Sequence, residues 1–562
     1  MSNGKLWGVG LGPGDPELVT VKAARVIAAA DVIAFHSARH GRSISRATAA
    51  PYMRPDQLEE HLIYPVTTET TDHPGGYQGA IDEFYEHSAE RLAVHLSAGR
   101  SVALLAAGDP LFYSSYMHMH RRLADRFEAE IIPGITSVSA ASAALGTPLV
   151  EGEQVLTVLP GTLPTDELTR RLRDTDAAAI MKLGRTYPGV RQALSDSGRL
   201  ADAYYIERAS STRERVLAAD DVDDADVPYF SITLVPGPRP TTPLRLANSA
   251  RAQQHRAGAA DVSTTDTGRA VPTGRSRTSG AGSASRIFSG EDATERGAAS
   301  GPGDGTGADN GAASELGEVV VVGLGPGSPD WTTPEVERAL AEATDLVGYT
   351  TYINRVPSRP GQRRHASDNR VESERAAMAL DLAGQGAKVV VVSSGDPGVF
   401  AMAAAVFEES ADPQWRGVPV RVLPGLTAAN AVASRVGAPL GHDYAMISLS
   451  DRLKPWEVVA QRLSAVAAAD MAIAIYNPAS SQRTWQVAAM RDVLLEHRKP
   501  DTPVVLGRDV GGPTESVRVI TLADLDPAEV DMRTLLIIGA STTAVIESDH
   551  GTRVYTSRRY QR

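Results

Sequence analysis

The chain has 562 residues, of which 42% are hydrophobic and 22% are charged, a composition typical of water-soluble globular proteins. Its length exceeds what a single hydrophobic core normally serves, so we expect at least two domains. The net charge of −12 argues against a general nucleic-acid binder, and the lack of cysteine excludes disulfides, thiolate metal sites and cysteine nucleophiles.

The amino-terminal stretch MSNGKLWGVGLGPGD has only a short apolar run interrupted by glycine, which is unlike a signal peptide. No stretch approaches the ~20 apolar residues that are needed to cross a membrane. We therefore expect a cytoplasmic protein with no membrane partner, no nucleic-acid partner and no metal site.

Apolar, β-rich runs alternate with helical patterns at both ends of the chain. The runs of the first part lie at 6–12, 101–109, 129–134, 177–184 and 202–209. Their counterparts in the second part lie at 319–325, 388–396, 420–425, 471–478 and 502–509. Helical patterns between the runs, such as 16–30 and 333–343, predict an α/β fold with helices on the faces of the sheets.

The segment between the two parts has a different composition. From about residue 240 to 315 it consists mainly of Ala, Gly, Ser, Thr and charged residues. Such a segment buries too little apolar surface to offset its ordering entropy, so we predict a disordered linker at 241–315. The chain then divides into domains at 1–240 and 316–562, and a functional tail is the alternative interpretation of the linker.

Three motifs occur twice, in the same order and with similar spacing. The paired segments are Val9–Pro16 with Val322–Pro329, Ala106–Tyr113 with Ser393–Phe400, and Pro133–Leu149 with Pro424–Leu440. The last pair has equal length and the same end residues. These matches predict a tandem of homologous catalytic domains.

The glycine-rich turns first suggest a dinucleotide site, whose backbone N–H groups cradle a pyrophosphate. Here, however, Pro13 and Pro326 stand inside the turns, where proline removes an N–H donor. The acidic residue expected after the second strand is also misplaced, because Asp31 and Asp345 precede that strand. The sequence therefore disfavours nicotinamide and flavin cofactors.

The other repeated turns indicate a smaller and less anionic ligand. The GDP motifs, 108–110 and 395–397, each follow a strand and place a carboxylate at its carboxyl end, where open α/β sheets bind ligands. Thr136 and Thr427 add hydroxyl groups at the end of a further strand. Each of these residues alone could be a helix cap, but together they predict a pocket for an amino-acid or nucleoside ligand.

The turn GLGPGD, the loop GDP and the turn PGIT, in this order, resemble the tetrapyrrole methylases, which use S-adenosylmethionine. The resemblance covers both domains and leaves out only the linker. It implies that each domain has two α/β subdomains with the cofactor cleft between them, and that S-adenosylhomocysteine is the product. It also implies small-molecule tetrapyrrole substrates and a homodimer formed through the domain contacts of the family.

Longer stretches imply two different reactions. In the first domain, LAAGDPLFYSSYMHMHRRL and YYIERASSTRERV resemble precorrin-2 C-20-methyltransferase, which forms precorrin-3A. In the second domain, SLSDRLKPWE and YNPASSQR resemble precorrin-3B C-17-methyltransferase, which contracts the ring and forms precorrin-4. Arg452 replaces a leucine that is common in this family. The alternatives are a methyltransferase for uroporphyrinogen III, a cobalt-precorrin methyltransferase of the anaerobic route, and a non-catalytic scaffold domain.

The resemblance also implies cofactor-binding residues in each domain. In the first domain these are Pro13, Gly108, Asp109, Phe112, Thr136, Ser137, Met181 and Ala209. In the second domain they are Pro326, Gly395, Asp396, Val399, Thr427, Ala428, Tyr476 and Gly511.

A tetrapyrrole carries many carboxylates, so its cleft should be basic. Candidate substrate-binding residues in the first domain are His36, Arg39, His40, Arg42 and Arg46. Those in the second domain are Arg363, Arg364, His365 and Arg370. Solvated loop charges are the alternative interpretation of both sets. Candidates for acid–base catalysis of ring contraction are His365, Asp451 and Lys454.

Overall fold

The computed structural model describes residues 3–39, 41–66, 71–151, 154–238, 316–368, 372–451, 455–480, 483–547 and 551–557. They form two homologous halves, 3–238 and 316–557, which belong to one compact unit. The predicted linker at 241–315 lies outside the described residues. No helix in the described ranges is both long and apolar enough to span a membrane.

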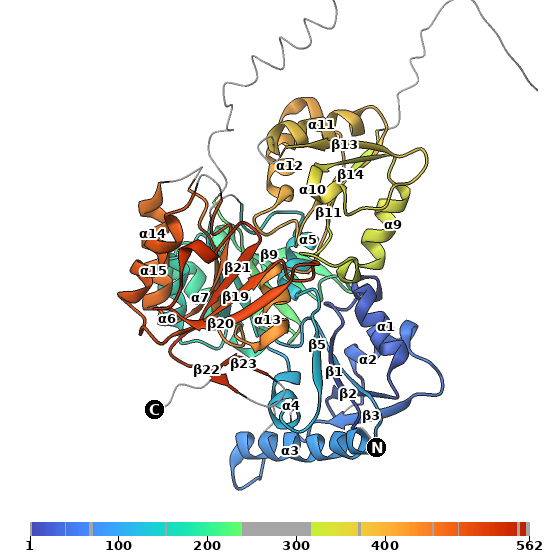
Figure 1. The fold of residues 1–562 in the computed structure, drawn as a ribbon, viewed down its shortest axis with the longest axis vertical. Coiled ribbons are helices and arrows are strands. Elements are labelled where there is room, and N and C mark those ends of the chain that lie inside the picture. The colour runs from blue at the N-terminus through green and yellow to red at the C-terminus, as the bar shows by residue number, and fades with distance from the viewer. Residues whose placement is uncertain are drawn as a thin grey trace, which may run out of the picture. The chain divides into compact units, whose positions relative to one another are not determined.

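Each half begins with a five-stranded parallel sheet. The strands of the first half are β1 (Leu6–Gly10), β2 (Val32–Ser37), β3 (Leu58–Ile63), β4 (Val102–Ala106) and β5 (Ala129–Ile132). Those of the second half are β11 (Glu318–Gly323), β12 (Asp345–Tyr349), β13 (Arg363–Ser367), β14 (Lys388–Ser393) and β15 (Val420–Leu423). The orders β3-β2-β4-β1-β5 and β13-β12-β14-β11-β15 are equivalent, so the carboxyl ends of all five strands share one edge in each half (Figure 1).

Helices cover these sheets, and the sequence explains where they begin. Those of the first half are α1 (Val21–Ala29), α2 (Ile44–Ala49), α3 (Gly76–Ser97), α4 (Tyr116–Leu123) and α5 (Ser137–Leu145). Those of the second half are α9 (Pro334–Glu342), α10 (Thr350–Ile353), α11 (Glu372–Gly384), α12 (Met402–Ser410) and α13 (Ala428–Val436). Thr20 and Thr333 cap α1 and α9 by accepting backbone N–H bonds from Ala23 and Val336. The predicted α/β fold is confirmed.

The second subdomains of the two halves share one ten-stranded sheet. The first half contributes β6 (Leu156–Pro160), β7 (Ala177–Met181), β8 (Tyr204–Glu207), β9 (Arg215–Ala218) and β10 (Ser231–Val235). The second half contributes β17 (Tyr444–Ser448), β18 (Ala472–Tyr476), β19 (Pro503–Arg508), β20 (Ser516–Thr521) and β21 (Thr534–Ile538). The order is β20-β19-β21-β18-β17-β6-β7-β10-β8-β9, and the halves join where β17 pairs antiparallel with β6. Helices α6 (Thr165–Arg173), α7 (Tyr187–Asp196), α14 (Trp456–Ala468) and α15 (Gln486–Leu495) pack in the same subdomains.

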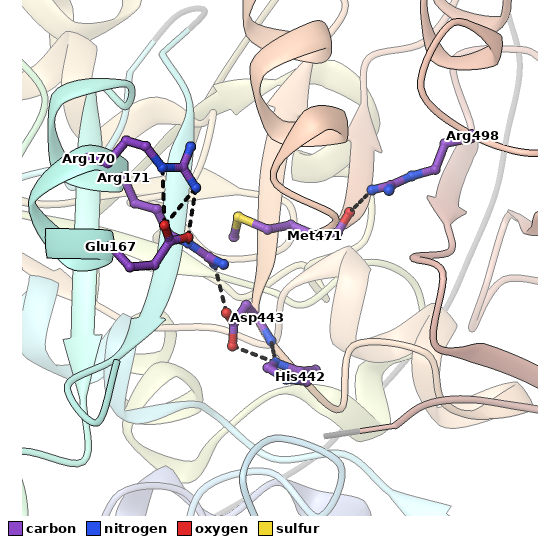
Figure 2. Close-up of polar contacts among 7 residues, drawn as sticks. All are labelled: Glu167, Arg170, Arg171, His442, Asp443, Met471 and Arg498. Atoms are coloured by element: carbon purple, nitrogen blue, oxygen red, sulfur yellow. Dashed lines mark hydrogen bonds and ion pairs between the residues drawn. The ribbon is translucent and has the colours of Figure 1, made fainter. Parts of the chain in front are cut away.

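Buried ion pairs support this junction between the halves. Arg171 on α6 contacts Asp443, which precedes β17, with Nη1 and Oδ2 2.7 Å apart and side chains only 10% and 6% exposed. Glu167 holds the other side of the Arg171 guanidinium, and His442 contacts the second Asp443 oxygen (Figure 2). Because both members of the Arg171–Asp443 pair are buried, removal of either one would cost a buried charge one of its partners at the junction.

The first subdomains also contact each other, and their contacts are reciprocal. Arg25 of α1 pairs with Asp330 of the second half, with Nη2 and Oδ2 2.5 Å apart. In return, Arg338 of α9 pairs with Glu17 of the first half. Equivalent elements therefore face each other, as they do across the interface of a twofold-symmetric dimer.

A small third sheet belongs to the second half. It has the order β16-β23-β22, with β16 at Gly437–Ala438, β22 at Thr543–Ile546 and β23 at Arg553–Thr556. β23 runs parallel to β16 and antiparallel to β22.

Candidate active sites

The first glycine turn and the GDP loop are hydrogen-bonded to each other at the carboxyl edge of the first sheet. In the first half, the Gly12 N–H donates to the Gly108 carbonyl over 3.2 Å, and the Gly108 N–H donates back over 2.7 Å. The same bridge joins Gly325 and Gly395 in the second half. All four glycines have φ between +65° and +72°, a conformation that disfavours other residues. The repeated turns therefore form the same two-loop structure in both halves.

The PGIT and PGLT turns pack directly on this two-loop structure. A Cβ added at Gly134 would lie 2.2 Å from the Gly108 carbonyl oxygen. A Cβ at Gly425 would lie 2.3 Å from the Gly395 carbonyl oxygen. The third motif of each half needs glycine for this close approach of backbone to backbone.

Asp109 and Asp396 join the turns rather than capping the next helix. The carboxylate of Asp109 accepts the backbone N–H of Leu111 over 2.9 Å and that of Gly134 over 3.0 Å. Asp396 accepts the equivalent N–H groups of Gly398 and Gly425 over the same distances. Because each acid bonds to a turn more than 20 residues away, it fixes the GDP loop against the third turn.

Both acids also receive a hydrogen bond from the opposite half of the chain. Asn430 on α13 bonds to Asp109, and Ser139 on α5 bonds to Asp396. Burial raises the pKa of each carboxyl to about 6, although these bonds and the backbone N–H groups lower it. The two sets of turns are therefore physically connected across the junction.

Thr136 and Thr427 are buried and cap α5 and α13. Thr136 Oγ1 accepts the Ser139 N–H over 3.3 Å, and Thr427 Oγ1 accepts the Asn430 N–H over 3.2 Å. Ser137 and Ala428 follow them in the first helical turn and are half-buried. The capping role that the sequence left open is thus present in both halves.

Two other predicted cofactor-binding residues lie against the opposite half. The Phe112 ring is 5.5 Å from the ring of Tyr444 on β17. Val399 forms a β-bridge with Val150. Both side chains are buried, so only their main chains remain available to a ligand at this edge.

The strand ends of the second subdomain reach the GDP loops. Met181 ends β7, and the next residue, Lys182, places Nζ 4.2 Å from the ring centroid of Tyr113. In the second half, Tyr476 ends β18, lies 5.2 Å from Phe400 between ring centroids, and accepts the Ala429 N–H over 3.2 Å. These contacts cross from one subdomain to the other in each half.

The last predicted position of each set differs between the halves. Arg208 and Asp509 are equivalent, because both have positive φ and both donate their backbone N–H to a carbonyl of a later segment. Ser210 and Gly511 each come two residues later, so they are equivalent too. Ala209 is thus equivalent to Val510.

The Gly327 turn is close to this loop, since a Cβ at Gly327 would lie 2.5 Å from the Val510 carbonyl oxygen. At Gly14, the equivalent Cβ would meet nothing within 4 Å, so the first half is more open here. Pro13 and Pro326, beside these turns, are half-buried.

His36 lies in an aromatic cluster near the carboxyl end of β2. Its ring stacks on Tyr64 at 5.4 Å, with Phe84 at 6.0 Å. Burial lowers the pKa of His36 to about 4, and its Nε2 atom has no hydrogen-bond partner among the described residues. The Tyr64 hydroxyl bonds to Ser115, which follows the GDP loop, so the cluster adjoins the turns.

The other predicted substrate-binding residues of the first half lie elsewhere. Arg46 pairs with Glu59, with Nη2 and Oε1 2.7 Å apart. Arg39 and Arg42 are exposed. His40 lies outside the described residues, as do Arg370 and Lys454 of the second half.

Arg363 and His365 contact a carboxylate at the opposite edge of the sheet. Arg363 Nη2 and His365 Nε2 each lie 2.7 Å from an oxygen of Asp345, the first residue of β12. Burial would raise the pKa of Asp345, but the bonds from Arg363, His365 and Thr344 lower it. Arg364 bonds to the Val356 carbonyl over 2.8 Å. The structure does not bring these three basic residues to the turns, because the amino ends of parallel strands lie away from the carboxyl edge.

Arg355, which is not among the predicted site residues, lies at the turns of the second half. Its guanidinium donates to the carbonyls of Leu324 and Gly325, over 3.1 and 2.8 Å, and to Ser394 Oγ over 3.3 Å. It thereby fastens the first turn to the GDP loop. An arginine shortly after the second apolar strand, in the run VGYTTYINR at 347–355, is the signal in the sequence that could have indicated it.

Asp451 follows β17 and accepts a hydrogen bond from Gln486 Nε2 over 2.8 Å. β17 and β18 are parallel, so Asp451 lies at the same sheet edge as Tyr476. Arg483 ties these strand ends together by donating to the carbonyls of Leu449 and Asn477, over 3.2 and 2.8 Å. Within the described ranges, no group of three or more His, Asp or Glu side chains is placed to hold a metal ion.

Comparison with known families finds the same duplication. The model of the Tetrapyrrole (Corrin/Porphyrin) Methylases matches residues 5–223 and again residues 318–526. The cobalamin biosynthesis protein CobIJ of Mycobacterium tuberculosis is 58% identical over 563 aligned residues, which cover 100% of this chain and 96% of that protein.

Each half also resembles a separate enzyme. The precorrin-2 C(20)-methyltransferase of Sinorhizobium sp. is 53% identical to the first half over 235 residues, 42% of this chain and 96% of that enzyme. The precorrin-3B C(17)-methyltransferase of Sinorhizobium sp. is 47% identical to the second half over 247 residues, 43% of this chain and 97% of that enzyme. The crystal structure of the methyltransferase CobJ, 47% identical, covers 43% of this chain and 100% of its own with a TM-score of 0.42.

Proposed function

Because the chain belongs to the tetrapyrrole (corrin/porphyrin) methylases, we propose that it is a bifunctional S-adenosylmethionine-dependent methyltransferase of corrin biosynthesis. The first half methylates precorrin-2 at C-20. The second half methylates precorrin-3B at C-17 and contracts the ring. The observation that carries this proposal is that one chain is similar over its full length to CobIJ, while its halves separately resemble a C(20)- and a C(17)-methyltransferase.

The turns at the carboxyl edge fit a ligand that is held by the main chain. At Gly108 and Gly395 an added Cβ would meet nothing closer than 4.0 and 3.9 Å, so the backbone there is open to a ligand. Gly14 is open in the same way. S-adenosylmethionine would bring an already activated methyl group to these turns.

The residues of the turns then have separate tasks. The main chains of Pro13, Gly108 and Phe112 hold the cofactor in the first half, with Thr136 and Ser137 closing the pocket. Asp109 acts mainly by fixing the GDP loop, because its oxygens already accept two backbone N–H groups. The second half uses Pro326, Gly395, Val399, Thr427 and Ala428 in the same way.

Methyl transfer depends on orientation and on a dry site more than on a strong base. The strand ends at Met181 and Tyr476 face the GDP loops and restrict access to them. In the first half, His36 is neutral, because burial lowers its pKa to about 4. Its Nε2 is buried without a partner among the described residues and is our candidate acceptor for the proton that leaves C-20.

Ring contraction in the second half needs acid–base assistance. Of the three residues predicted for it, we favour Asp451, which lies at the same sheet edge as Tyr476. His365 bonds to Asp345 instead, and Lys454 lies outside the described residues. Asp451→Asn should therefore reduce C-17 methylation with ring contraction while leaving C-20 methylation unchanged.

We also propose a cytoplasmic location and, from the family resemblance, a homodimer. The pairing of β6 with β17 inside one chain occupies those two strand edges, so a homodimer must use other surfaces. The outer strands β9 and β20 are the remaining edges of the ten-stranded sheet. Light scattering after size exclusion distinguishes the 59.4 kDa monomer from twice that mass.

A direct test uses purified full-length protein, S-adenosylmethionine and precorrin-2, with products followed by mass spectrometry. One added methyl group at C-20 supports the proposed first activity. Calorimetric titration with S-adenosylhomocysteine separates two enzymes from one enzyme with a scaffold domain. Two binding sites per chain support the proposal, and a single site contradicts it.

A further inference from the structure

A cavity of about 580 Å³ lies between the two halves, beside the GDP loop of the first half, which contributes Leu111 to its lining. One wall is α4 of the first half, and the other is the small sheet β16-β23-β22 of the second half. We call it the junction cavity. None of the predicted cofactor-binding residues lines it. Its size lies within the range of small-molecule sites.

His120 on α4 is the buried polar group of the junction cavity. It is only 9% exposed, and its Nε2 atom has no hydrogen-bond partner in the described part of the chain. Its Nδ1 atom lies 3.1 Å from the hydroxyl oxygen of Tyr116, which is 1% exposed. Burial is the main cause that lowers the pKa of His120 to about 4, and the positive charges of Arg553 and Arg121 lower it further. The ring is therefore neutral.

The contact with Tyr116 decides which ring nitrogen of His120 carries the proton. If Nδ1 donated, both the Tyr116 O–H and the Nε2 lone pair would be buried without a partner. If the Tyr116 O–H donates to Nδ1, only the Nε2–H is left without one, so this tautomer is favoured. His120 therefore carries a buried hydrogen-bond donor beside the junction cavity, which a ligand would reach by displacing the atoms that cover it.

Arg553 on β23 adds a positive charge beside this donor. Within the described part of the chain, its guanidinium bonds only to the Thr552 carbonyl, over 3.3 Å, and no carboxylate pairs with it. Arg553 and His120 also line an adjoining cavity of about 150 Å³, so they stand together where the two spaces meet. Asp82 and Asp125 line the junction cavity too, together with Arg121 and Arg122.

Apolar side chains complete the walls. Leu111 and Met117 from the first half and Val554 from the second are 2%, 6% and 1% exposed and line the cavity. Among the described residues, a ligand here would find the Arg553 guanidinium, the neutral His120 ring and an apolar surface. This combination fits an acceptor group that carries negative charge on an apolar body.

We propose that the junction cavity binds a small carboxylate with an apolar body. The carboxylate is held by Arg553 and the Nε2–H of His120, and the apolar body lies against Leu111, Met117 and Val554. Because the two polar groups come from different halves, the ligand would connect them. The cavity adjoins the GDP loop through Leu111, but none of the predicted cofactor-binding residues lines it, and the proposal does not depend on the proposed reactions.

The test measures binding of benzoate and of its neutral analogue benzamide to the full-length protein by calorimetry. We expect benzoate to bind with a Kd of about 1 mM or tighter, and benzamide at least about tenfold more weakly. Arg553→Gln should weaken benzoate about tenfold and leave benzamide unchanged, because it removes one charge-assisted bond. Arg518→Gln, an exposed arginine on β20 paired with Glu529, is the matched control and should bind benzoate like the wild type.

Titration of the same variants with S-adenosylhomocysteine keeps this test separate from the proposed function. An unchanged affinity in Arg553→Gln shows that the protein is folded and that the methyl-transfer sites are intact. Absence of benzoate binding to the wild type overturns the proposal, as does equal affinity for benzoate and benzamide or unchanged benzoate binding in Arg553→Gln. Inorganic phosphate binding more tightly than benzoate would overturn the assignment to carboxylates.

Discussion

Asn430 of the second half donates a hydrogen bond to the carboxylate of Asp109 in the first half. The Oδ1 atom of the same amide accepts a bond from Thr427 Oγ1 over 2.5 Å. One side chain therefore links the helix cap of one half to the GDP loop of the other. Ser139 and Asp396 form the reverse connection. A substitution in one set of turns should therefore also alter ligand binding at the other set.

Asp109→Asn should weaken S-adenosylhomocysteine binding about tenfold in the first half, with a smaller loss in the second. The NH₂ group of an asparagine at this position would face N–H donors that now bond to the carboxylate. It would also weaken the hydrogen bond from Asn430. Calorimetric titration of the two sites measures both losses, and Asp396→Asn should show the reverse pattern. Asp202→Asn, an exposed residue, is the control. An effect confined to one site in both variants would contradict the coupling.

The raised pKa of Asp109 makes its contribution to stability depend on pH. The folded-state pKa is about 6, whereas an unfolded aspartate titrates near ~3.9. Between these values the folded protein binds more protons, so stability from this group falls as pH rises from ~4 to ~6, by roughly 2–3 kcal/mol. Asn does not titrate. Asp109→Asn should therefore be more destabilising at pH 4.5 than at pH 7, measured by urea unfolding. An equal difference at both pH values would show that the carboxyl is not shifted.

Arg355→Gln should impair only the second half. The substitution removes the guanidinium that joins the Leu324 and Gly325 carbonyls to Ser394, and one charge-assisted bond is worth ~1.5–3 kcal/mol. We expect the second S-adenosylhomocysteine site to weaken by about tenfold or more, with C-20 methylation unchanged. Arg416→Gln, an exposed arginine of the same half, should behave like the wild type. A loss at both sites would mean that Arg355 acts on the whole fold.

Cleavage at a protease site introduced within 241–315 should leave the two halves associated. They share the β6–β17 pairing and the buried Arg171–Asp443 pair. The fragments should elute together from a sizing column under native conditions and separate in urea. Asp443→Asn should weaken the association, because it removes the ion pair that joins Arg171 of the first half to the second half and leaves Arg171 with Glu167 alone. Fragments that separate without urea would show that the junction is too weak to hold the halves together.

Methyl transfer should stop after one step when the protein receives only precorrin-2 and S-adenosylmethionine. In the resembled aerobic route, an oxidation separates C-20 from C-17 methylation. The sequence has no cysteine for an iron–sulfur cluster, and its glycine turns disfavour flavin and nicotinamide. Mass spectrometry should therefore show a single added methyl group. A second methyl group without an oxidant, particularly on a cobalt-loaded substrate, would favour the anaerobic route.

Much of each half could be predicted from local sequence. The apolar runs at 6–12 and 319–325 became β1 and β11, and the repeated turns lie together at one sheet edge. The basic run RRHASDNR was misleading because its partner, Asp345, lies about 20 residues away and shares the far edge of the sheet with it. The bonds from Asn430 to Asp109 and from β17 to β6 depend on how two distant segments pack, which periodicity and spacing do not encode.

The β6–β17 pairing also has a consequence for synthesis of the chain. Thr157 and Ala445 are paired neighbours, yet about 290 residues separate them. At ~5–20 residues per second, β6 leaves the ribosome roughly 15–60 s before β17. During this interval the apolar strand Leu156–Pro160, fully buried in the finished protein, forms an open sheet edge. The nascent first half is therefore most exposed to aggregation along this strand until its own carboxyl-terminal half arrives to cover it.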